Sequence, residues 1–129
     1  MSVIDKVRDL NLPDDQYVVI GSGLLDAWGL RQSNDIDLVV SAAQFDMLAR
    51  DEKYTQGWKG SDRFLTWEEY EIFDNWGDDG AFEVLMKDSI IVEGVRFVSP
   101  EYLIAWKRKR AWKKDIQDIT LLKRRLENE

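Results

Sequence analysis

Two short apolar runs constrain the fold of this chain more than any other feature of its sequence. Residues 17–22 read Tyr-Val-Val-Ile-Gly-Ser, and residues 35–41 read Asp-Ile-Asp-Leu-Val-Val-Ser. Runs of this length, rich in β-branched residues and bounded by Gly or Ser, are typical of buried strands. A chain of 129 residues, 44% of them hydrophobic, is expected to form one domain around such strands, over residues 1–129.

Local signals predict further helices and strands around these two runs. Ser2, Ser41 and Ser99 each precede a helical pattern as an N-cap would, and Pro100 follows the last of them as a first-turn proline. The expected helices span residues 2–10, 23–30, 42–51, 81–89 and 99–129, and the other expected strands are 62–67, 70–76 and a hairpin over 90–98 turning at Glu93 and Gly94. This succession predicts an α+β or α/β fold, a small mixed β-sheet flanked by helices and ending in C-terminal helices.

The C-terminal segment differs in charge from the rest of the chain. Residues 1–106 carry 9 Lys and Arg against 21 Asp and Glu, a balance of −12, whereas residues 107–129 carry 9 against 4, a balance of +5. A basic segment on an acidic body leaves room for a phosphate-bearing ligand. We expect this segment to stay helical, with one apolar stripe formed by Trp112, Ile116, Ile119, Leu122 and Leu126.

The composition excludes several kinds of site. The chain has no Cys and no His, so disulfides, thiolate metal sites, imidazole bases and His-ligated zinc are all excluded. The first ten residues alternate charged with apolar side chains and contain no signal-peptide core, and no apolar run approaches the length of a membrane span. We therefore expect a soluble, cytoplasmic protein with no membrane partner.

Two aspartates interrupt the second apolar run. In a strand, Asp35 and Asp37 project from the same face, about 6.5–7 Å apart, while Ile36 and Leu38 anchor the other face in the core. Carboxylates converging to about 5 Å repel each other by about 3 kcal/mol at an effective dielectric near 20. A hard divalent cation, Mg²⁺ or Mn²⁺, would remove that repulsion. The alternative is an edge strand with two solvated acids.

The Gly-rich turn after the first run is the second candidate site. In Ile-Gly-Ser-Gly, residues 20–23, the backbone amides of Ser22 and Gly23 could cradle a phosphate at the start of a short helix. A dinucleotide-binding loop would need glycine at position 26, where the chain has Asp26. The alternative is a strand-to-helix turn that needs glycine only for its backbone conformation.

Together the two motifs resemble the signature of the DNA polymerase β-like nucleotidyltransferase superfamily. Gly21-Ser22 is followed, after twelve residues, by Asp35-Ile36-Asp37-Leu38, and residues 31–38 fit the pattern R-x-[TS]-x-D-I-D-L of its minimal members. Residues 99–122, with their K-D-x-x-D-I, are similar to the ending of those chains. The resemblance covers roughly residues 17–122, and the minimal members that the chain resembles are similar to AbiEii-type and antitoxin-type nucleotidyltransferases of bacterial defence and toxin–antitoxin systems.

The resemblance implies a nucleotidyltransferase-like fold and the transfer of a nucleoside monophosphate from an NTP to an acceptor hydroxyl. It implies metal ligation and catalysis by Asp35, Asp37 and a third carboxylate, with two Mg²⁺ or Mn²⁺ ions. Glu71 fits that third place best, with Asp74 and Glu83 as alternatives. The resemblance also implies nucleotide binding by Gly21, Ser22 and Lys107, although Lys107 could instead be a solvated helix lysine. Arg31 and Ser33 match the pattern too, or brace the loop before Asp35.

Three classes of function remain open on these residues. The first is an active nucleotidyltransferase whose acceptor is a protein, a tRNA or a small molecule. The second is a catalytically weak or inactive binding module of the same fold, an antitoxin or regulatory subunit that acts through a partner protein. The third is a nucleic-acid adaptor that uses the basic run at residues 107–114.

Overall fold

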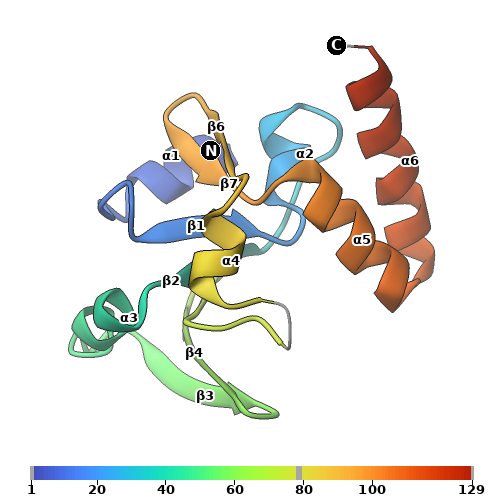
Figure 1. Ribbon diagram of the computed structural model, residues 1–129. Helices are drawn as coiled ribbons and strands as arrows, with labels where there is room; N and C mark the ends of the chain where they lie inside the picture. The colour runs from blue at the N-terminus through green and yellow to red at the C-terminus, as the bar shows by residue number, and fades with distance from the viewer. Residues whose placement is uncertain (1, 78–79, 129) are drawn as a thin grey trace.

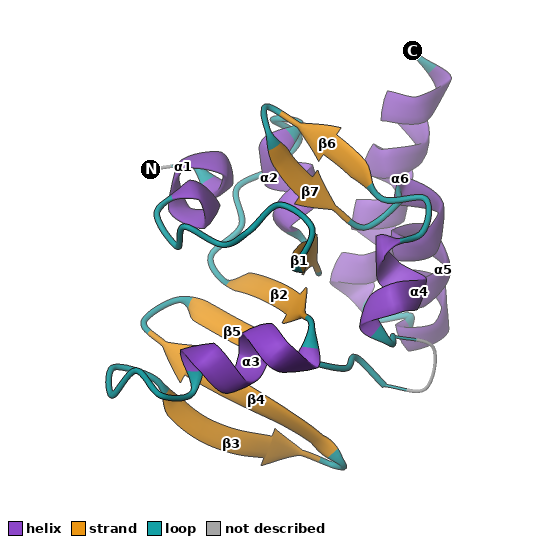
Figure 2. Ribbon diagram, turned by 60° about the vertical axis from the view of Figure 1, so that its left-hand side comes forward, coloured by secondary structure: helices purple, strands orange, loops and turns teal. Residues whose placement is uncertain are grey.

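The computed structural model describes residues 2–77 and 80–128, and its strands form a seven-stranded sheet in the order β3-β4-β5-β2-β1-β7-β6 (Figures 1 and 2). The two predicted strands, 17–22 and 35–41, correspond to the slightly shorter β1 (Tyr17–Ile20) and β2 (Ile36–Val40), antiparallel neighbours in the middle of the sheet. β2 also pairs in parallel with β5 (Tyr70–Phe73), and β1 pairs in parallel with β7 (Val95–Phe97). The sheet is therefore mixed and flanked by helices, which confirms the predicted α+β class.

The other elements complete the sheet and its surroundings. Their bounds are β3 Thr55–Lys59, β4 Asp62–Trp67, β6 Ile90–Val92, α1 Val3–Arg8, α2 Gly23–Ala27, α3 Ala42–Leu48, α4 Phe82–Met86, α5 Pro100–Arg110 and α6 Lys113–Glu127. The last two helices lie side by side at one end of the molecule, and α6 also packs against α2 (Figure 1). Within the described residues, none of these helices has the length and apolarity needed to span a bilayer.

The predicted local signals are present in the structure. The hydroxyl oxygens of Ser2, Ser41 and Ser99 each accept a hydrogen bond from the backbone N–H three residues on, which caps α1, α3 and α5. The β6–β7 hairpin turns at Glu93 and Gly94, both at positive φ, as a tight two-residue hairpin turn requires. These segments are specified by residues close in sequence.

Two expectations about the elements were wrong. Strand β3 was not predicted, because its residues are mostly exposed and show no alternation of buried and exposed side chains. The C-terminal segment is helical, as predicted, but Ala111 adopts a left-handed conformation with φ 54°, which ends α5 and interrupts the predicted apolar stripe. Trp112 and Ile116 are consequently 56% and 59% exposed and do not join the apolar stripe, whose buried member is Leu122.

The central strands supply the core that holds the candidate site in place. Val18 and Val19 of β1 and Leu38 and Val39 of β2 are at most 1% exposed. Ile36 is also buried, as the strand prediction for the Asp-Ile-Asp segment required. The orientation of Asp37 is thereby fixed by the buried Ile36 and Leu38, which alternate with it along β2.

Candidate active site

Asp37 lies in the central strand between the two motifs. It is the register partner of Ile20 on β1 and of Glu71 on β5. Side chains at paired positions of neighbouring strands lie on the same face of a sheet, so Asp37 and Glu71 face each other. Asp35 immediately precedes β2 and is exposed at the cleft. The structure thus places Asp37 and Glu71, two of the three predicted carboxylates, side by side. The third, Asp35, lies just before the first residue of β2.

The Asp37 carboxyl is held in an unfavourable environment for a charge. Burial, the negative charge of Glu71, a hydrogen bond with Glu71 and the charge of Asp35 raise the pKa of Asp37 to about 7, although the charge of Lys59 opposes this shift. The Oδ1 atom of Asp37 is buried and has no hydrogen-bond partner among the described residues. This carboxyl therefore keeps its proton to a higher pH than an exposed aspartate does.

We predict a pH dependence of stability that arises from Asp37. Without added metal, the free energy of unfolding should fall as pH rises from about 4 to about 7, because folded Asp37 still holds a proton that the unfolded chain has lost. Asp37→Asn should remove this slope, so its stability relative to the wild type should rise by about 2–4 kcal/mol across the window. Urea denaturation at several pH values measures this.

The control for this prediction is Asp15→Asn, an exposed aspartate in the turn before β1. It removes the same charge away from the site and should retain the wild-type slope. If Asp37→Asn also retained that slope, another group would be responsible for it.

Gly21 has no side chain, which lets the Gly-Ser turn lie close to Asp37. Its φ is +66°, which favours glycine, and a Cβ atom added there would lie 2.8 Å from Oδ2 of Asp37. The turn therefore needs glycine for two reasons, its backbone conformation and its contact with the carboxylate. The predicted strand-to-helix turn is present, and its backbone lies close to the Asp37 carboxylate.

Ser22 links the first motif to the C-terminal helices. Its Oγ atom accepts hydrogen bonds from Nη2 of Arg31, at 2.8 Å, and from Nζ of Lys107, at 3.4 Å. The predicted meeting of the Gly-Ser turn with Lys107 is therefore seen in the structure. Lys107 is fully buried, so it is not the solvated helix lysine that the sequence left open.

Asp115 and Asp118 hold these cations in place. Asp118 accepts two hydrogen bonds from Arg31, at 2.6 and 2.7 Å, and pairs with Lys107 at 3.0 Å. Asp115 accepts two from Arg110, at 2.7 and 2.6 Å, and lies 3.6 Å from Lys107. Both aspartates are at most 1% exposed, so their charges are matched inside the protein by three cations.

The pKa values of the two aspartates follow from these pairs. Hydrogen bonds from Arg110 hold the pKa of Asp115 below its usual range, despite burial. Burial raises the pKa of Asp118, but hydrogen bonds from Arg31 and Lys107 outweigh it and leave the pKa lowered. Both side chains are thus carboxylates at neutral pH, and the three cations have fixed positions.

These groups line one cleft of about 430 Å³. Asp35 and Asp37 lie on its wall together with Gly21, Ser22 and Lys107. Trp76, Trp106 and Arg110 also line it, and the Arg110 guanidinium lies 4.4 Å from the Trp106 ring and 4.2 Å from the Trp112 ring. Of the predicted residues, Asp35, Asp37, Gly21, Ser22, Lys107, Arg31 and Ser33 line this cleft.

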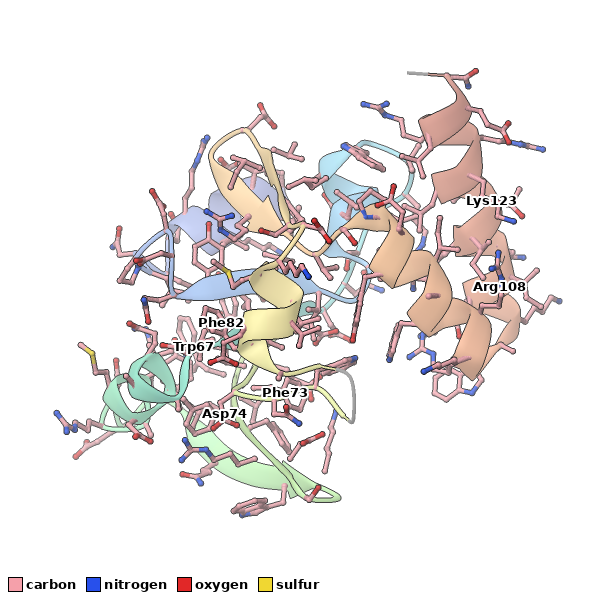
Figure 3. All side chains as sticks on the ribbon, viewed as in Figure 1. Trp67, Phe73, Asp74, Phe82, Arg108 and Lys123 are labelled. Carbon is pink, nitrogen blue, oxygen red and sulfur yellow. The ribbon has the colours of Figure 1, made fainter. Side chains whose placement is uncertain are left out.

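The other predicted acidic residues lie apart from the Asp37 carboxylate. Asp74 pairs with Nε of Arg63 at 2.7 Å, and Figure 3 shows it among the strand side chains, separated from Arg108 and Lys123 on the terminal helices. Glu83 is exposed on α4. Glu71 is therefore the acid that lies beside Asp37.

Ser33 has a supporting role in the loop before β2. Its hydroxyl donates a hydrogen bond to the carbonyl oxygen of Asp35 at 2.8 Å, and its backbone N–H donates to Asp26 at 2.9 Å. This is the bracing role that the sequence left open for it. Arg31 does more than brace the loop, since its guanidinium joins Ser22 to Asp118 across the cleft.

Two acidic residues at or beside the cleft were given no role from the sequence. Asp115 and Asp118 are the aspartates of the K-D-x-x-D-I pattern, and they stand three residues apart on α6, so they share one face. Among residues 2–77 and 80–128, no three acidic side chains are gathered closely enough to be identified as a metal-binding cluster. Glu71 instead has an ammonium partner, because its Oε1 lies 2.7 Å from Nζ of Lys59.

Comparison with known proteins adds no family assignment. The sequence matches no protein-family model, and no curated protein matches it significantly. The functional argument therefore rests on the geometry of the cleft and on the motifs that line it.

Proposed function

We propose that this protein is a metal-dependent nucleotidyltransferase, which moves a nucleoside monophosphate from an NTP to an acceptor hydroxyl. The observation that carries the proposal is the buried, unpartnered Oδ1 of Asp37, in the same cleft as a serine that accepts hydrogen bonds from two fixed cations. One end of the cleft thus favours a cation and the other an anion. A metal-bound nucleoside triphosphate has both charges in that arrangement.

The carboxylates suit a hard cation. Asp35 and Asp37 would hold it, with Glu71 next to them, and oxygen-only ligands favour Mg²⁺ or Mn²⁺. The contact of Gly21 with Asp37 leaves no room for a side chain that could cover this carboxylate. When bound, such a cation would neutralise the charge that develops on the phosphate and on the acceptor oxygen.

The opposite end of the cleft suits the triphosphate. Because the Ser22 oxygen already accepts from Arg31 and Lys107, its own O–H is left to donate, and it donates no hydrogen bond to any described residue. Charge-assisted hydrogen bonds to phosphate oxygens are the strong ones, and here the donors are positioned in advance. We expect Ser22 to contact the triphosphate, with Arg31 and the buried Lys107 positioning its hydroxyl and supplying positive charge behind it.

A catalytically weak binding module is the second candidate. The Lys59–Glu71 ion pair favours it, because a carboxylate held by a lysine is a poorer metal ligand. In that case the cleft would still bind an NTP, and the protein would act as an antitoxin or regulatory subunit through a partner protein. We place either activity in the cytoplasm, where NTPs are available. The acceptor of the active form would be a protein, a tRNA or a small molecule.

A thermal-shift experiment tests the proposal. Mg²⁺ or Mn²⁺ should raise the melting temperature, and more so together with an NTP, because ligands that bind only the native state stabilise it by about 1.4 kcal/mol per tenfold excess above saturation. The double variant Asp35→Asn with Asp37→Asn should lose this response. Its fold should be retained, and stabilised near neutral pH without metal, since repulsion is relieved.

The matched control is Asp14→Asn with Asp15→Asn, which removes the same two charges from an exposed turn. It should respond to metal as the wild type does. An unchanged response in the Asp35/Asp37 variant would place metal binding elsewhere and overturn the proposal. Incubation with a panel of labelled NTPs and a cell lysate then separates enzyme from binding module, since only the enzyme labels an acceptor.

A further inference from the structure

Lys59 pairs with Glu71 although the two residues lie two strands apart in the sheet. It ends β3, and β4 lies between that strand and β5, which carries Glu71. Nevertheless its Nζ lies 2.7 Å from Oε1 of Glu71. An ammonium group thus pairs with the third predicted carboxylate, which the two-ion expectation assigns to metal ligation.

Two aromatic rings, one on β4 and one on β5, lie under the Lys59 ammonium. Phe64 on β4 is the register partner of Gly57 and of Phe73, and its ring approaches within 2.8 Å of the place where a Gly57 Cβ would be. The Lys59 ammonium lies over this aromatic pair, 5.3 Å from the Phe64 ring and 5.7 Å from the Phe73 ring. Two ring faces and one carboxylate therefore favour this position of the ammonium.

The charges around Asp37 then suffice for one divalent cation. Asp35, Asp37 and Glu71 contribute three negative charges when ionised, and Lys59 contributes one positive charge against Glu71. The remaining two negative charges match a single divalent cation. A second divalent cation would have to take Oε1 of Glu71 from the lysine and add its charge to a site already balanced.

We propose that the cleft binds a single divalent cation, on Asp35 and Asp37, and that Lys59 supplies the second positive charge by pairing with Glu71. This inference rests on the proposed function and departs from the two-ion expectation of the sequence. Lys59 is a positioning residue in this arrangement, since it acts through Glu71. The number of cations bound per chain, rather than activity, is the quantity that tests it.

The experiment counts Mn²⁺ ions bound to the full chain, without nucleotide, by electron paramagnetic resonance of the free ion. The wild type should bind one Mn²⁺ per chain. Lys59→Met keeps an apolar side chain over Phe64 and Phe73 but frees Glu71, and should bind two. Lys59→Arg keeps the charge and should bind one again. Lys53→Met, an exposed lysine in the loop before β3, is the matched control and should bind one.

The outcomes distinguish a failure of the single-cation inference from a failure of the proposed nucleotidyltransferase function. Two Mn²⁺ ions on the wild type, or one on Lys59→Met, would overturn the role of Lys59 while leaving the proposed metal site in place. No Mn²⁺ on the wild type would overturn the proposed function, and this inference with it. The wild-type count decides the matter even if Lys59→Met fails to fold.

Discussion

Asp118→Asn should lower the free energy of unfolding by about 3–5 kcal/mol, because it removes one partner from a buried ionic network. Asp118 is the partner of Arg31 through two short hydrogen bonds and of the fully buried Lys107 at 3.0 Å. An asparagine has almost the same shape but cannot balance these charges. Lys107 would be left with Asp115, at 3.6 Å, which already pairs with Arg110.

Urea denaturation measures this loss, and Glu127→Gln on the same helix is the control. Glu127 is exposed near the end of α6, so its neutralisation should change stability by no more than about 0.5 kcal/mol. A value for Asp118→Asn as small as that of the control would contradict the network. It would mean that water reaches Lys107 when its partner is removed.

Lys107→Met should weaken NTP binding roughly tenfold to a hundredfold, without changing metal binding in the absence of nucleotide. Lys107 acts through Ser22, and losing a positively charged donor to the hydroxyl that contacts the phosphate should cost about 1–3 kcal/mol, as for charge-assisted hydrogen bonds, which corresponds to that range of affinity. Methionine retains most of the buried stem, and Asp115 and Asp118 retain Arg110 and Arg31 as partners. Titration calorimetry with a non-hydrolysable NTP analogue gives the affinity.

Arg108→Met is the control, since it removes the same charge from the next residue of α5, on its exposed side. It should change the affinity little. Equal losses in the two variants would indicate a diffuse positive field rather than a specific contact. The terminal helices would then resemble a nucleic-acid or partner surface, and the enzymatic proposal would depend on the carboxylates alone.

Features encoded by neighbouring residues were predicted from the sequence. The three serine caps and the Glu93-Gly94 turn depend on contacts within four residues, so their signals are local. The alternation of Ile36 and Leu38 with the aspartates likewise gave the orientation of β2, because side chains in a strand alternate between faces. Their placement required no knowledge of the rest of the chain.

Features that depend on distant partners were not predictable in the same way. Asp115 and Asp118 are buried only because Arg31, Lys107 and Arg110 neutralise them, and Arg31 is 87 residues from Asp118. The break at Ala111 carries no glycine or proline signal, so the apolar spacing of Trp112 and Ile116 suggested burial that the bend prevents. The pairing of Lys59 with Glu71 depends on the order of three strands.

The ionic network makes the docking of the last helix and the assembly of the cleft a single event. Arg31 comes from the loop before β2 and Lys107 from α5, yet both are held by an aspartate of α6. If α6 frayed from the body, both cations would lose the group that fixes them, and Ser22 would lose its two donors. Amide hydrogen exchange in α6 therefore reports how much of the protein can bind the triphosphate. When this helix is undocked, Ser22, Arg31 and Lys107 no longer have fixed positions.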